Sequence, residues 1–448
     1  MVRFRQFGFC LLLAIALSAN AANTNTLVWH VATDRVSADI RGEKLWPLLE
    51  NIANQTGWHI FVEPDAEHDA SVKFQNLQSS DALKMLLGDL NFALVSPTNA
   101  PAQLYVFKTS RQNATRPVVV RARHVPNELI LRVKPGTDMD ALAKLLGAKI
   151  IGRLDGLGLY RLQFADAAAT DAALAQLQND SDVLAASYNN YLDAPPPVQS
   201  VSAAGAPLPP INLQLKPPSD SGKIIVGLVD TAVQPLDGSL NNFLLKQVSV
   251  ADGTQADSPD LTHGTAMAET ILRAVGITEQ GNSSVQILPV DVYGSAQSAT
   301  TWNVASGIVS AVNGGANIIN LSLGGPSEDA ILAGVIQSVE NDGIPIFAAA
   351  GNQPTASPTY PAAYSGIYAV TALEQGKIAP YANYGSFISF AAPDGTIAYL
   401  GNQAWFTAGT SVSTANMTGI AAGYADATHQ SWPQITAKLY QSFSVPRN

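Results

Sequence analysis

The chain has 448 residues, of which 47% are hydrophobic, and its 25 Lys and Arg stand against 35 Asp and Glu. At about 150 residues per domain, this length predicts roughly three domains with enough apolar material for buried cores. The acidic balance makes nucleic acid a poor partner, because binding a phosphate backbone requires clustered positive charge. No stretch after the first apolar run is long and apolar enough to span a membrane.

Residues 1–21 have the three regions of a secretory signal peptide. Arg3 and Arg5 precede an apolar run over 7–17, and a small-residue segment ends at Ala21. Cleavage there removes Cys10, the only cysteine, so the exported protein would carry no disulfide. It also leaves 23 basic residues against 35 acidic ones, a net charge of −12. We therefore expect an exported protein with no membrane span once the signal is removed.

Residues 27–108 are predicted to form a small α+β domain. The segment "GEKLWPLLENIANQTG" places Leu45, Leu48, Leu49 and Ile52 on one helical face, "WHIFVEP" follows as a strand and "SSDALKMLLGDL" as a second helix. This order and "QTGWHIFVEP" resemble the short N-terminal domain of secretins and TonB-dependent receptors; the alternative is a generic packing unit. The resemblance implies a Gram-negative envelope, whether periplasm or secretion, and an envelope protein as partner.

Residues 117–193 are predicted to form a second α+β domain, with a strand, a helix, two strands hinged at Gly156, a helix and a last strand. This order is that of a ferredoxin-like sandwich. The segments "KPGTD", "LGA", "GLGLYRL" and "NNY" resemble the propeptides of subtilisin-like proteases, which implies a segment that assists folding and blocks the cleft. The Pro-rich residues 194–218 are predicted to be an extended, cleavable linker without a core element, so the mature form is expected to begin between Ala194 and Gly222.

Residues 219–448 are predicted to form an α/β domain. The apolar runs "KIIVGLVD", "SVQILPVDVY", "ANIINLSLG", "IPIFAAAGN" and "IYAVTAL" are typical of parallel strands covered on both faces, and helical segments lie between them. In such sheets, ligands bind beyond the carboxyl ends of the strands. Asp230 closes the first of these strands and Asn352 follows the fourth, so both are candidates for a site at that edge.

Ser411, in "FTAGTSVSTANMTGIAAG", is either a small residue that packs a helix or a nucleophile at the head of that helix. A serine hydroxyl reacts only when an oriented base removes its proton. Of the two histidines after residue 219, His263 heads a predicted helix, whereas His429 follows a helix and is expected to face water. Asp230 is either a turn former or the partner of that base. Asn352 is either a turn residue or a donor to an oxyanion.

The segments "VGLVDTAV", "HGTAMAE", "AAAGN" and "GTSVSTANMTGIAA" resemble the Asp, His, oxyanion Asn and Ser motifs of the subtilisin-like serine proteases (subtilases, the S8 family), in that family's Asp-His-Ser order. The resemblance implies a subtilisin-like parallel sheet with helices on both faces, preceded by the two small α+β domains. It further implies Ser411 as nucleophile, His263 as general base and acid, Asp230 as its orienting partner and Asn352 in the oxyanion hole.

The same resemblance implies substrate-binding residues on neighbouring loops. A peptide substrate would lie as an added strand along one segment, and a threonine at the floor of the first specificity pocket would favour medium-sized apolar side chains. The residues concerned are Ser322, Leu323, Gly324, Ala350, Gly351 and Thr359.

The chain departs from the family pattern at several positions. Ala232 replaces a glycine, Glu269 a small residue, and Ala415 and Asn416 a proline and a histidine. No cofactor is expected, and because no acidic calcium-loop pattern occurs, the calcium dependence common in the family is left open. The sequence thus predicts an exported serine endopeptidase with an acyl-enzyme intermediate, made as an autoinhibited precursor. The alternatives are an envelope scaffold that recognises peptides with little or no activity and, least favoured, an esterase.

Overall fold

The computed structural model describes residues 25–30, 34–56, 58–95, 102–118, 124–192, 195, 198–201, 211, 213–217, 223–279, 281–356 and 358–445. The chain divides into two compact units, residues 1–122 and 123–448. The predicted signal peptide lies outside the described residues. Among the helices that the structure describes, none has both the length and the apolar character required to cross a bilayer.

The first unit contains two sheets, a three-stranded sheet of order β1-β2-β4 and a four-stranded sheet of order β5-β6-β3-β7. The four apolar positions predicted for the first helix are all buried. The predicted boundary at residue 108 is too early, because β7 pairs with β3 and Val118 packs into the core. The elements are β1 (Thr26–His30), β2 (Arg35–Lys44), α1 (Leu45–Thr56), β3 (His59–Val62), β4 (Asp69–Leu77), α2 (Ser79–Leu87), β5 (Asn91–Val95), β6 (Gln103–Phe107) and β7 (Arg116–Pro117).

The second unit begins with the predicted ferredoxin-like sandwich, residues 124–192, whose antiparallel strands lie in the order β11-β8-β10-β9. Its elements are β8 (His124–Val133), α3 (Met139–Leu145), β9 (Lys149–Leu154), β10 (Leu159–Gln163), α4 (Ala167–Leu177) and β11 (Val183–Leu192). The turn between β9 and β10 depends on Gly158 rather than on Gly156. Gly158 has a φ of +62°, and a Cβ there would lie 2.6 Å from the carbonyl oxygen of Val133.

Residues 223–445 form the predicted α/β domain around an eight-stranded sheet of order β15-β17-β14-β19-β20-β21-β22, with β23 also paired to β21. The five predicted strands are β17, β14, β19, β20 and β21, and they pair in parallel. The strands of this sheet are β14 (Ile225–Asp230), β15 (Val248–Ser249), β17 (Gln286–Asp291), β19 (Ile318–Leu321), β20 (Ile346–Ala349), β21 (Ile367–Glu374), β22 (Lys377–Ile378) and β23 (Phe390–Pro393).

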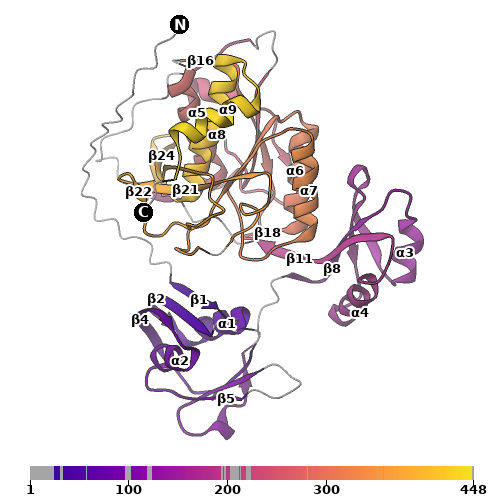
Figure 1. Ribbon diagram of the computed structural model, residues 1–448, viewed down its shortest axis with the longest axis vertical. Coiled ribbons are helices and arrows are strands. Elements are labelled where there is room, and N and C mark those ends of the chain that lie inside the picture. The colour runs from indigo at the N-terminus through magenta and orange to yellow at the C-terminus, as the bar shows by residue number, and fades with distance from the viewer. Residues whose placement is uncertain are drawn as a thin grey trace. The chain divides into compact units, whose positions relative to one another are not determined.

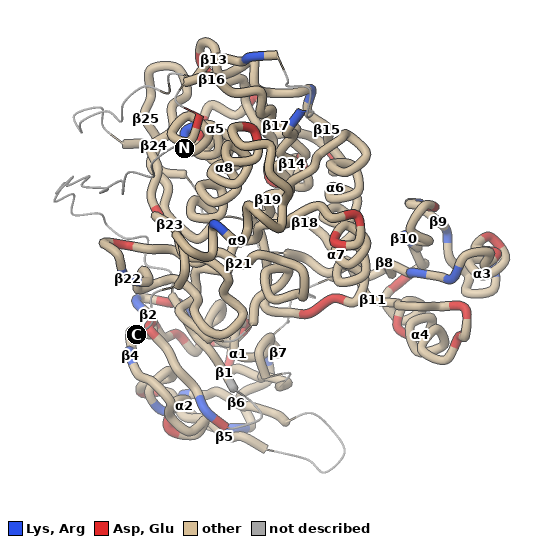
Figure 2. The backbone as a smooth tube through the Cα atoms, turned by 45° about the horizontal axis from the view of Figure 1, so that its top comes forward, with Lys and Arg blue, Asp and Glu red and all other residues tan. Residues whose placement is uncertain are grey.

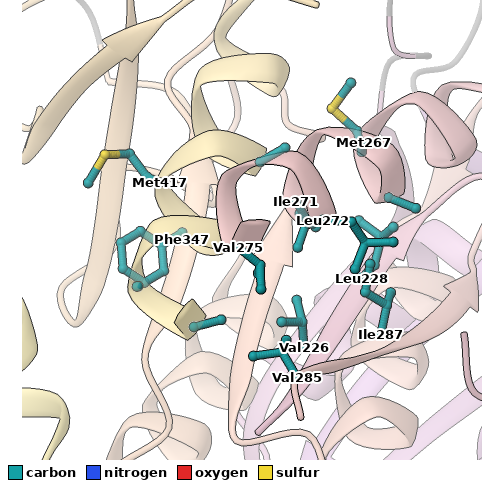
Figure 3. Close-up of a cluster of buried hydrophobic side chains, with 14 of the residues drawn as sticks. Val226, Leu228, Met267, Ile271, Leu272, Val275, Val285, Ile287, Phe347 and Met417 are labelled. Atoms are coloured by element: carbon teal, nitrogen blue, oxygen red, sulfur yellow. The ribbon is translucent and has the colours of Figure 1, made fainter. Parts of the chain in front are cut away.

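Helices cover both faces of this sheet, as predicted (Figure 1). One hydrophobic cluster joins the sheet to α5, α8 and α9, and a second joins it to α6 and α7. Figure 3 shows Ile271, Leu272 and Val275 of α5 beside Val226 and Leu228 of β14. Few positions along these elements are charged residues (Figure 2), as expected for structure buried between layers. The helices are α5 (His263–Glu279), α6 (Thr301–Asn313), α7 (Ala330–Asn341), α8 (Thr410–Thr428) and α9 (Trp432–Ser442).

The Pro-rich segment 194–218 differs from the predicted linker. β12 (Gln199–Val201) pairs antiparallel with β25 (Gln403–Ala408), which in turn pairs with β24 (Gly395–Leu400). β13 (Gln214–Leu215) pairs with β16 (Asn282–Ser283), and Leu213 is fully buried in the α/β core. The prediction that this segment contains no core element is therefore wrong for these residues. The composition of this segment correctly indicates that it forms no domain of its own. It does not show that a few of its residues pair with strands of the α/β domain or pack into its core.

Candidate active site

Asp230 and His263 meet at the carboxyl edge of the sheet, since β14 ends at the first and α5 begins at the second. Nδ1 of His263 lies 2.8 Å from Oδ1 of Asp230, and the two side chains are only 4% and 1% exposed. A carboxylate can only accept, so Nδ1 carries the proton and Nε2 is left as the proton acceptor. This is the orientation that a general base requires.

The main chain after Asp230 holds this pair in place. The N–H of Thr231 donates to Oδ1 of Asp230 at 2.7 Å, and the N–H of Gly264 donates to Oγ1 of Thr231 at 2.8 Å. A Cβ on Gly264 would lie 2.2 Å from the carbonyl oxygen of Thr231, so the strand and the helix can approach this closely only at a glycine. The sequence predicted that a small residue, Gly264, would let another backbone approach His263, but it did not predict that Thr231 would bond to that glycine.

Ser411 lies in the first turn of α8, with a side chain almost fully buried. Its Oγ donates to the carbonyl oxygen of Ser322 at 3.4 Å, and Oγ of Ser322 donates to the carbonyl oxygen of Ser411 at 3.3 Å. Nε2 of His263 has no hydrogen-bond partner among the described residues, so the serine hydroxyl points to Ser322 and not to the imidazole. A serine changes partner by rotation about its Cα–Cβ bond, and catalytic hydrogen bonds often tighten only when substrate binds.

Asn352 lies beside the start of α8. Its Oδ1 accepts from the N–H of Thr410 at 2.9 Å and from Oγ1 of Thr410 at 3.1 Å, which fixes the amide and leaves Nδ2 as the donor. Gly351, with a φ of +105°, makes the turn before it and donates its N–H to Oγ1 of Thr410 at 3.1 Å. Thr410 was missed from sequence, although it directly precedes Ser411.

The predicted substrate-binding residues lie on the loops that follow β19 and β20. Gly325, next to Ser322-Leu323-Gly324, exchanges two backbone hydrogen bonds of 2.8 Å with Tyr360. A Cβ on Gly324 would lie 2.9 Å from the carbonyl oxygen of Tyr360, so this approach also depends on glycine. The hydroxyl of Thr359 donates to the carbonyl oxygen of Ala350, which joins two more of the predicted residues.

Three of the departures from the family pattern, at Ala415, Asn416 and Glu269, can be followed in the structure. Helix α8 continues without a break through Ala415, and Nδ2 of Asn416 donates to the carbonyl oxygen of Pro393 at 3.2 Å. Glu269 is buried on α5, and both of its carboxylate oxygens lie 3.2 Å from the N–H of Tyr399. Burial raises the pKa of Glu269 to about 7. His429 ends α8 and is exposed, as predicted.

Two family models match parts of this chain. The model of the subtilase family matches residues 221–442, and that of the fervidolysin N-terminal prodomain matches residues 110–189. Thermostable alkaline protease from Halalkalibacterium halodurans is 36% identical over 166 residues, which cover 36% of this chain and 46% of that protein. Thermitase from Thermoactinomyces vulgaris is 32% identical over 203 residues, which cover 44% of this chain and 72% of thermitase.

The crystal structure of fervidolysin from Fervidobacterium pennivorans superposes with a TM-score of 0.53 at 16% identity, covering 69% of this chain and 56% of that one. At this identity the match supports the fold alone. The chain spans about half the length of the curated relatives that it matches first. The match to the family model, together with the identity to thermitase over most of its length, shows that the chain belongs to the subtilase family.

Proposed function

We propose that the protein is an exported serine endopeptidase that hydrolyses peptide bonds through an acyl-enzyme on Ser411 and is made as an autoinhibited precursor. The observation that carries the proposal is the buried pair of Asp230 and His263, whose 2.8 Å contact leaves Nε2 as the proton acceptor. Ser411, at the start of α8, follows this pair in the Asp-His-Ser order of the family.

In the proposed reaction, Oγ of Ser411 attacks the scissile carbonyl carbon while Nε2 of His263 takes the hydroxyl proton. Asp230 stabilises the imidazolium. The negative oxygen that forms accepts hydrogen bonds from Nδ2 of Asn352 and from the N–H of Ser411. Ser411 lies in the first turn of α8, where backbone N–H groups have no acceptor within the helix. His263 then donates its proton to the leaving amine, and water hydrolyses the acyl-enzyme by the same steps.

The proposed substrate is an extended peptide. The segment of Ser322, Leu323 and Gly324 continues a central strand, and backbone hydrogen bonds along such a segment recognise a peptide independently of its side chains. The hydroxyl of Thr359 donates to the carbonyl oxygen of Ala350. We propose a preference for medium-sized apolar side chains, as the family resemblance implies for a threonine at this position.

Autoinhibition is supported by the contacts of the prodomain with the α/β domain. Tyr191 and Leu192, at the end of β11, pair antiparallel with β18 (Ala299–Thr300). The side chains of Ser187 and Asn190 donate to Oδ2 of Asp329 at 3.3 and 2.9 Å. A segment that binds already ordered in the prodomain loses little entropy on docking and inhibits accordingly.

Processing is proposed to occur upstream of Ile211. The range of start sites predicted from the sequence extends to Gly222, but Leu213 is buried in the core and β13 pairs with β16, so residues 213–217 belong with the mature domain. Residues 27–108 are proposed to bind an envelope partner in a Gram-negative periplasm or outside the cell.

The test is to express the chain without residues 1–21 beside a Ser411→Ala variant and to follow both by intact mass. We expect the native chain to shorten within 193–210, to react covalently with a serine-directed phosphonate, and the variant to do neither. A native chain that neither shortens nor reacts, with a folded spectrum, would contradict the protease proposal and favour the peptide-binding scaffold.

A further inference from the structure

Asn320 is a polar residue in the middle of the buried central strand β19, where its neighbours are all apolar. Its side chain is fully buried, and burial of an amide is unfavourable unless both of its ends are hydrogen-bonded. Both ends are engaged. Nδ2 donates to Oγ of Ser322 at 2.9 Å, and Oδ1 accepts from Oγ1 of Thr418 at 2.9 Å.

These bonds form a directed chain between α8 and β19. The hydroxyl of Thr418 donates to Asn320, Asn320 donates to Ser322, and Ser322 donates to the carbonyl oxygen of Ser411 at 3.3 Å. Each hydroxyl in the chain donates once, and Ser322 also accepts once, so the chain has one consistent direction. It begins and ends on the same helix.

The spacing of these residues matches the two elements. Ser411 and Thr418 are seven residues apart, which places them on one face of α8, and Asn320 and Ser322 are two residues apart, which places them on one side of an extended strand. The bonds therefore join α8 to the strand at two points, two turns of helix apart. Such a pair of contacts opposes both rotation of α8 about its axis and sliding along β19.

We propose that Asn320 and Thr418 are positioning residues that set Ser411 in register with the peptide-binding segment of Ser322, Leu323 and Gly324. The inference rests on the proposed function, because it assigns to these residues the alignment of that site. Neither residue touches the reacting atoms. They act through Ser322, which lies between the nucleophile and the segment that would hold the substrate.

The test compares Thr418→Val and Thr418→Ser in the processed enzyme. Valine keeps the volume and removes the hydroxyl, whereas serine retains the donor. We expect Thr418→Val to lower kcat and the rate of phosphonate labelling by about tenfold or more, with KM and the pH midpoint of kcat changed little, and Thr418→Ser to restore most of the loss. Thr436→Val is the matched control, since Thr436 is also buried and helical but bonds only within α9.

A native kcat in Thr418→Val, or an equal loss in the valine and serine variants, would overturn the positioning role. If Thr418→Val does not fold, Thr418→Ala removes the same donor without a branched side chain and must show the same selective loss of kcat. A native enzyme that neither cleaves peptides nor labels would contradict the proposed function instead, so the two failures are distinguishable.

Discussion

Asn189 of the prodomain makes a contact whose removal tests the proposed autoinhibition directly. It is fully buried, and its Oδ1 accepts from the N–H of Trp302 at 3.0 Å, in the first turn of α6. Its Nδ2 donates to Oε2 of Glu128 at 2.7 Å, and Glu128 is in turn held by Arg161 through two bonds of 2.8 Å. The prodomain thus supplies a capping acceptor to a helix of the domain that we propose it inhibits.

Asn189→Ala removes that acceptor and leaves the N–H of Trp302 without it while the prodomain is bound. Loss of a helix-capping side chain costs about 1–2 kcal/mol, which corresponds to about a five- to thirtyfold weaker complex. The bond to Glu128 lies within the prodomain, so its loss affects prodomain stability and adds to the effect.

The assay is the inhibition of peptide hydrolysis by the cleaved prodomain that remains in the processed mixture, followed on dilution. Because the complex is weaker, we expect activity to appear at a prodomain concentration about tenfold higher with the Asn189→Ala prodomain than with the native prodomain. Asn179→Ala is the control, because Asn179 is exposed in the turn after α4. Native-like inhibition by Asn189→Ala, with the control also native-like, would refute the capping argument.

Three further predictions concern pH, processing and metal. Burial raises the pKa of Glu269 from 4.5 to about 7, so between these pH values the folded chain keeps a proton that the unfolded chain has lost. The free energy of unfolding therefore falls by about 3 kcal/mol as the pH rises through that window. In the Ser411→Ala background, Glu269→Gln should therefore raise Tm by several degrees at pH 8 and change it little at pH 4; a difference independent of pH would contradict this. N-terminal sequencing of the mature form should give a start before Ile211, and a start within residues 218–222 would contradict the core role of this segment. Lys216→Met should lower Tm, since Lys216 pairs at 3.2 Å with Glu279 and with the buried Asp426. Treatment with a calcium chelator should leave activity within about twofold, because no calcium-loop pattern occurs, and a loss restored by Ca²⁺ would disprove it.

Much of the α/β domain could be predicted from local patterns. Runs such as "KIIVGLVD" are apolar between their ends because the strands are covered on both faces, and the structure confirms the five predicted runs as parallel neighbours. Asp230 stood out because a carboxylate ends such a run, and His263 because few histidines compete with it. These signals lie in neighbouring residues and need no knowledge of the fold.

The partners of the polar atoms could not be predicted in this way. Thr410 holds Asn352 across 58 residues of sequence, and Thr418 holds Asn320 across 98. Nothing in the composition of either segment indicates these pairs. The same holds for β12 and β13, whose Pro-rich surroundings predicted a linker while their backbone groups pair with distant strands.

The sequence by itself determined the main strands and helices of the α/β domain, their order and the residue types at the carboxyl edge of the sheet, because apolar periodicity and capping act over a few residues. Only the tertiary structure decided which hydrogen-bonding groups face one another, because that depends on how α8, β19 and the prodomain pack. Burial makes those pairings obligatory, since an unpaired polar group in the core is costly. The proposed alignment of Ser411 therefore depends partly on Asn320, which lies on another strand, 91 residues before the nucleophile.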